Sequence, residues 1–230
     1  MKHKLEAADI TGSAPILAQA KLDQRSAFAV RHLIAAARFS RQCGAVQAAH
    51  AGKPLGAFYD EQTACVSATI MLAVASMESN INEHFEDSDV LLPELSSGAR
   101  NEVCDLLSTA SILDKYMKVL SLKGLPQFDK GGPPYQDACL LIAVRNELVH
   151  FHPEWHGNQD RHEKLGRRLA GKFDLSPFIS EDTAVMFPQR IVSHGCTRWA
   201  VKTALTFMEE FAKRVSLPNR FQYHHQHLTP

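Results

Sequence analysis

The sequence predicts an all-α protein, a helical bundle of about five main helices. Apolar residues recur every three or four positions in several long segments, which places them on one face of an α-helix. We find no stretch that alternates apolar and polar residues as half-buried strands do. With 230 residues, of which 45% are hydrophobic, the chain can bury a real core, and we expect one domain.

The expected domain covers residues 23–216. A polar lead, residues 1–22, has no clear period and is expected to be loosely ordered, and residues 217–230 are expected to form a flexible His-rich tail. The first helix is predicted at 23–49, before the breaker AGKPLG. Its apolar positions at helical spacing are Val30, Leu33, Ile34 and Ala37.

A second, longer helix is predicted at 60–85, and its small residues favour close packing on a neighbour. Its expected buried stripe is Ala64, Ala68, Met71, Ala75, Glu78, Asn82 and Phe85. A third helix is predicted at 101–120, ending before Gly124 and Pro126. One face of it carries Val103, Leu106, Ala110, Leu113, Met117 and Leu120.

The stretch YQDACLLIAVRNELVHFH, residues 135–152, is predicted as one buried helix, and Pro133 and Pro134 suit its first turn. At about 100° per residue, its apolar stripe contains Ala138, Leu141, Ile142, Leu148 and Val149. A short basic helix is then expected at 159–172, followed by a connection with little regular structure at 173–195. The last helix, at 196–215, is expected to bury Ala200, Ala204, Phe207 and Phe211 and to expose Lys202, Glu209 and Lys213.

Arg145 lies near the middle of the apolar stripe of the helix at 135–152. A guanidinium cannot lose its proton to relieve burial, so it needs a carboxylate, a phosphate or a cleft. Glu78 interrupts the stripe of the helix at 60–85 in the same way. Two opposite charges on two core stripes are most simply explained by an ion pair, and we expect Glu78 to contact Arg145.

The motif Arg145-Asn146-Glu147-Leu148-Val149-His150, late in a helix of an all-α chain, resembles the motif of HEPN domains. The resemblance covers roughly residues 60–215 in helix order and character. It implies a metal-independent endoribonuclease of a toxin, defence or RNA-processing system, although other HEPN proteins are non-catalytic. It also implies a homodimer in which Arg145, Asn146 and His150 act as two copies, with Glu78 orienting Arg145 or binding RNA. An antitoxin or another regulatory partner would fit such a role.

The expected reaction is RNA cleavage by transesterification, with an imidazole moving a proton and a guanidinium stabilising charge on the phosphate. This chemistry needs no cofactor and no metal. The basic helix could track an RNA backbone, and a charged solvent face explains it about equally well. The cations concerned are Arg161, Lys164, Arg167, Arg168 and Lys172.

Two other interpretations stay open. The first is a non-catalytic dimerisation or ligand-binding module, in which Arg145 belongs to a structural ion pair and His150 caps a helix end. The second is a metal-binding sensor, which would need three of His152, Glu154, His156 and His162 to converge. A solvated His-rich turn is the more economical explanation of those residues.

The overall charge is zero, so this is no generally basic nucleic-acid binder, and RNA would need a local patch. Five widely spread cysteines, none in a CxxC pair, argue against disulfides and a zinc ribbon and favour the reducing cytosol. The N-terminus has no apolar signal segment, and the most apolar run, 68–77, is too short for a bilayer. A soluble cytoplasmic protein without a membrane partner is expected.

Overall fold

The computed structural model describes residues 26–155, 160–182 and 184–230 of the chain. Every regular element in these residues is a helix and none is a strand, which confirms the all-α prediction. The expected loose lead at 1–22 lies outside the described residues. The expected boundary of the domain at residue 23 is outside them as well.

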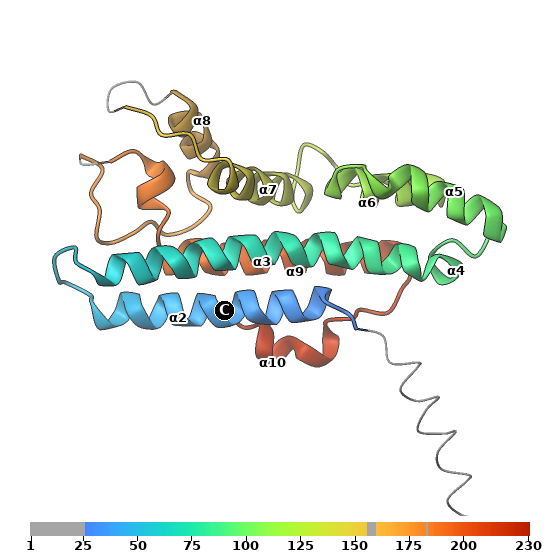
Figure 1. Cartoon of the computed structure of the whole chain (residues 1–230), viewed down its shortest axis with the longest axis horizontal. Coiled ribbons are helices and arrows are strands. Elements are labelled where there is room, and N and C mark those ends of the chain that lie inside the picture. The colour runs from blue at the N-terminus through green and yellow to red at the C-terminus, as the bar shows by residue number, and fades with distance from the viewer. Residues whose placement is uncertain (1–25, 156–159, 183) are drawn as a thin grey trace, which may run out of the picture.

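Three long helices run side by side and form the body of the molecule (Figure 1). They are α2 (Ala29–Ala49), α3 (Phe58–Glu86) and α9 (His194–Arg214). A second row lies along the other side of α3 and contains α7 (Tyr135–Val149), α6 (Ile112–Leu122) and α5 (Ser97–Ser108). The short helix α4 (Ser88–Leu91) turns the chain from α3 into that row.

Helix α3 packs against α2, α9, α7 and α6 and is therefore buried on several sides. The predicted stripe lies on the less buried face of α3, since Ala64, Glu78 and Asn82 are all exposed. Its buried positions include Cys65, Ile70, Ala73, Met77 and Ile81. By length and composition α3 could cross a membrane, and 56% of its most apolar stretch is buried inside the described structure.

The predicted helix at 101–120 is two helices, α5 and α6. Thr109 ends the first helix, and Ser111 begins the second by accepting a hydrogen bond from the Asp114 amide at 3.3 Å. The chain changes direction at this cap, so the residues on either side do not share one face. Leu106, expected to be buried, is accordingly 78% exposed, whereas Leu113 and Leu120 are buried.

The first and last long helices agree with their predicted apolar positions. Leu33 and Ala37 of α2 are buried, as are all four residues predicted for α9. The Glu83 carboxylate of α3 accepts hydrogen bonds from the Phe28 and Ala29 amides at 2.7 and 2.8 Å, and so caps the start of α2. Ser193 caps α9, because its hydroxyl accepts from the Cys196 amide at 3.1 Å.

The C-terminal residues are packed rather than forming the expected flexible tail. They form a 3-10 turn, Gln222–His224, and the helix α10 (His225–Leu228), which packs on α2. Phe221 and Leu228 are both 2% exposed, and Arg41 donates to the carbonyls of His227 and Thr229 at 3.2 and 2.6 Å. Phe221 and Leu228 therefore hold the C-terminal segment against the helices, although its histidines suggested a solvent-exposed end.

The region after α7 holds one more α-helix, α8 (Asp160–Leu169), shorter than the predicted 159–172. It packs against the π-helical turn η1 (Met186–Arg190), whose Phe187 is fully buried. The described part of 173–195 otherwise has little regular structure, as predicted. α8 thereby comes to lie beside the C-terminal end of α7, next to the motif (Figure 1).

Candidate functional site

The motif occupies the last turn of α7 and the residue that ends it. His150 is the C-cap, and its amide donates to the Asn146 carbonyl at 2.8 Å. The side chains of Asn146 and His150 are exposed, and that of Arg145 is partly buried. An imidazole and an amide thus face solvent at the end of a helix, with a guanidinium lying along the same turn.

The Arg145 guanidinium has no hydrogen bond and no ion pair to any residue that the structure describes, and its buried Nε lacks a partner. The expected ion pair with Glu78 is not formed. Glu78 is exposed on α3, because the buried face of that helix is rotated away from the predicted one. Nothing in this geometry supports Glu78 as the residue that orients Arg145. The arginine instead keeps its charge available for an anion.

Glu147, which lies between Asn146 and His150 in the motif, forms an ion pair with Arg161 of α8. Arg161 Nη2 donates to Glu147 Oε1 at 2.8 Å, and Arg161 Nε lies 2.8 Å from Oε2. One hydrogen bond and one close charge contact thus join Arg161 to Glu147. Arg161 therefore ties α8 to the last turn of α7.

The other predicted RNA-binding residues divide into two groups. Arg167 lies 3.4 Å from Glu163 on the same helix, and Lys172 lies 2.6 Å from Asp137 at the start of α7. Lys164 and Arg168 are exposed and form no ion pair with other described residues. Of the five cations that the sequence predicts for RNA binding, two, Lys164 and Arg168, therefore have no ion pair with other described residues.

Three exposed apolar residues lie at the end of the motif and just after it: Val149, Phe151 and Trp155, which are 49%, 44% and 88% exposed. We call them the 149–155 patch. His162 of α8 supports it from beneath: its ring stacks on Phe151 at 5.3 Å between centroids and is itself 2% exposed. The Glu154 carboxylate accepts from the His162 amide at 3.1 Å, which ties the segment to α8.

The metal interpretation is not supported in the part of the chain that the structure describes, where no group of three His, Cys, Asp or Glu side chains could hold an ion. His162 is buried between Phe151 and Phe187, and His152 is exposed. His156 lies outside the described residues. The cysteines Cys43, Cys65, Cys104, Cys139 and Cys196 are free thiols.

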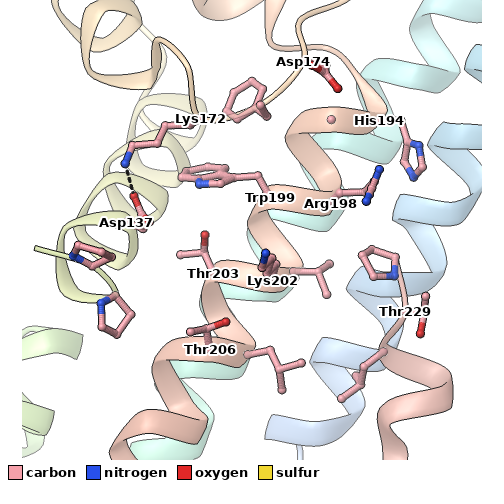
Figure 2. A pocket seen from close by; sticks show the side chains of 18 of the residues that line it. Asp137, Lys172, Asp174, His194, Arg198, Trp199, Lys202, Thr203, Thr206 and Thr229 are labelled. Carbon is pink, nitrogen blue, oxygen red and sulfur yellow. Dashed lines mark hydrogen bonds and ion pairs between the residues drawn. The ribbon is translucent and has the colours of Figure 1, made fainter.

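A second candidate site, which the sequence did not reveal, is a groove of about 960 Å³ over the solvent face of α9 (Figure 2). Arg198, Trp199 and Lys202 of α9 line it, together with His194 at its end. Burial, and then the nearby Arg198 charge, lower the pKa of His194. The only sequence signal was the expected exposure of Lys202, which by itself does not distinguish a groove from an ordinary helix surface.

No protein-family model matches this chain, and no curated protein or solved structure is significantly similar to it.

Proposed function

We propose that this protein is a metal-independent endoribonuclease of the HEPN type, with Arg145, Asn146 and His150 as its reactive groups. One observation carries the proposal: the Arg145 guanidinium lacks a carboxylate partner among the described residues and lies on the same helix end as the exposed His150. A structural arginine would donate to a carboxylate or, as Arg41 does, to backbone carbonyls, and Arg145 does neither within the described residues. An arginine that binds phosphate must be left free to do so.

In the proposed reaction the ribose 2′-oxygen attacks the adjacent phosphorus while its proton passes to a base. The bond from phosphorus to the 5′-oxygen breaks, the leaving oxygen takes a proton, and a 2′,3′-cyclic phosphate remains. His150 transfers these protons, and Arg145 stabilises the negative charge that builds on the phosphate oxygens. The Asn146 amide offers further hydrogen bonds to the phosphate.

A two-fold dimer would supply two copies of His150, one as base and one as acid. The 149–155 patch supports this arrangement, because exposed apolar residues directly beside the motif favour burial against a second copy. Such an interface should bury at least about 1,000 Å². Lys164 and Arg168 would then contact the RNA backbone on either side.

The proposed setting is the reducing cytosol, where five free cysteines are stable. There the enzyme acts as a toxin or defence component that an antitoxin or another regulatory partner controls. Both roles follow from the resemblance of the motif.

The decisive experiment incubates purified protein with structured and unstructured RNAs in EDTA. Wild type should cut and leave 2′,3′-cyclic ends, and His150→Ala should slow cutting by about 10²- to 10⁴-fold, the usual cost of losing a proton-transfer group. His152→Ala is the matched control, since this neighbouring histidine is also exposed but lies outside the motif. Arg145→Lys should also be poor, because an ammonium cannot make the two-point contact to phosphate.

Cleavage that requires a metal, equal cutting of all-deoxy substrates, or a fully active His150→Ala variant would each refute this mechanism. The second candidate function is a non-catalytic dimerisation module, which the 149–155 patch also favours. A protein that is dimeric through this patch but cuts none of the RNAs would support it.

A further inference from the structure

The groove over α9 has the size of a small-molecule site. Its volume of about 960 Å³ falls in the range typical of ligand pockets. Asp137 of α7 and Lys172 border one side, and Thr229 borders the other (Figure 2). Leu228 and Pro230, the neighbours of Thr229 in the chain, also line the groove. The packed C-terminal segment therefore completes a wall that an extended tail would leave open.

The floor of the groove carries uncompensated positive charge. Arg198 and Lys202 are four residues apart on α9, which places them one above the other on the same face. Both are exposed, and neither forms an ion pair with another described residue. Two side-chain carboxylates, of Asp137 and Asp174, and three Lys or Arg side chains line the groove, and Asp137 is already bound to Lys172 at 2.6 Å. The charged side chains that remain are Arg198, Lys202 and Asp174, and their net positive charge favours an anion.

The walls are apolar and partly flat. The Trp199 indole is partly buried and packs on Phe173, with ring centroids 5.3 Å apart. Figure 2 shows Trp199 on the side of α9 that faces Asp137 and Lys172, whereas Arg198 points to the opposite side. Leu205 and Leu228 add aliphatic surface. A ligand here would meet cations on the helix and apolar surface beside it.

The backbone holds this surface in place. Ser193 donates its hydroxyl to the Asp174 carbonyl at 2.7 Å, which fixes residues 173–174 at the start of α9. Gly195 permits this approach, because a Cβ there would collide with the backbone of Asp174. The Trp199 wall is thus preformed, which lowers the ordering cost of binding.

From this geometry we propose that the groove binds a small organic anion with a flat apolar body. The acid group lies between Arg198 and Lys202, and the ring system lies along the wall formed by Trp199. This site is separate from the motif at the other end of α7, so it stands whether or not the protein cleaves RNA.

The test uses anilinonaphthalene sulfonate and its uncharged analogue N-phenyl-1-naphthylamine, two probes with the same rings. Trp155 and Trp199 are the two tryptophans of the chain, so in a Trp155→Phe background Trp199 alone can transfer excitation energy to a bound probe. Sensitised emission then reports binding close to Trp199. Titration of the full chain should show the sulfonate binding more tightly than the neutral analogue.

Arg198→Gln with Lys202→Gln, added to that background, should weaken sulfonate binding by roughly tenfold or more, since each hydrogen bond to a charged group contributes strongly. The neutral probe should be unaffected. The control is Arg38→Gln with Lys213→Gln, which removes the same charge from exposed sites outside the groove. Circular dichroism checks that each variant is folded. No Trp199-sensitised emission, equal affinity for both probes, or unchanged sulfonate affinity in the Arg198 and Lys202 variant would overturn the proposal.

Discussion

At the scale of single residues, Glu83 joins three parts of the chain. One carboxylate oxygen caps the start of α2 through the Phe28 and Ala29 amides, and the other lies 3.0 Å from Arg220 in the C-terminal segment. Arg220 also lies 2.8 Å from Asp87 at the end of α3. Glu83 therefore stabilises a helix terminus and the docking of a distant segment at once.

We predict that Glu83→Ala lowers the free energy of unfolding by about 2–3 kcal/mol, the combined cost of a lost cap and a lost charged hydrogen bond. Urea titration measures this value. Glu86→Ala is the matched control, because Glu86 is exposed on the same helix, and it should change stability by less than about 0.5 kcal/mol. Equal effects of the two substitutions would show that the Glu83 contacts contribute little.

His84, the next residue, makes stability depend on pH. It is 3% exposed, and burial, followed by the Arg220 charge, lowers its pKa from 6.5 to about 4. Between these two values the unfolded chain binds a proton that the folded protein does not, so stability falls as the pH drops from 6.5 towards 4. The loss attributable to this residue approaches about 3 kcal/mol at the lower end.

The expected result is a flatter pH dependence in His84→Asn, which cannot take up a proton. Urea unfolding of wild type and variant across this range, compared at each pH, isolates the contribution of His84 from those of other histidines. Parallel curves for the two proteins would contradict the assignment.

At the scale of elements, helical periodicity located the long helices but did not always select their buried face. The start of α7 at Tyr135 and the apolar positions of α9 were predictable. Helix α9 also packs on α2, α3 and α7, but Lys202 and Lys213 keep one of its faces exposed, which leaves a single apolar stripe. Helix α3 has neighbours on several sides and small residues on most of its surface, so the pattern allowed two stripes. Choosing the wrong one placed Glu78 in the core and produced the ion pair with Arg145 that the structure lacks.

The break between α5 and α6 tests how much one cap contributes. Ser111→Ala removes the hydroxyl that accepts from the Asp114 amide, and we expect a loss of about 1 kcal/mol in thermal or urea unfolding. Ser121→Ala, at an exposed position in the last turn of α6, is the control and should be neutral or slightly stabilising, since alanine has the higher helix propensity. A neutral Ser111→Ala would mean that the packing of α6, rather than its cap, fixes the break.

At the scale of the whole molecule, the candidate site could be predicted only in part. The sequence alone showed Arg145, Asn146 and His150 as a spaced motif within one predicted helix. Three features depend on which helices meet, and the local sequence pattern does not encode that. They are the missing ion-pair partner of Arg145, the pairing of Arg161 with Glu147, and the α9 groove. Tertiary packing therefore decided which charges remain available for a ligand.

The last prediction concerns assembly. If the 149–155 patch is the interface of a two-fold dimer, wild type should be dimeric in light scattering at micromolar concentration, and Trp155→Glu should be monomeric, because it places a charge in an apolar contact. Leu106→Glu is the matched control: Leu106 is similarly exposed, at 78%, but belongs to α5 and should leave the dimer intact.

The same variants separate the composite site from a site within one chain. Under the proposed mechanism, monomeric Trp155→Glu should lose RNA cleavage although Arg145, Asn146 and His150 are unchanged, because each site then has one imidazole in place of two. A monodisperse wild-type monomer would exclude the composite site at once. A monomeric Trp155→Glu variant that cuts at the wild-type rate would show that one copy of the motif is sufficient for both proton transfers.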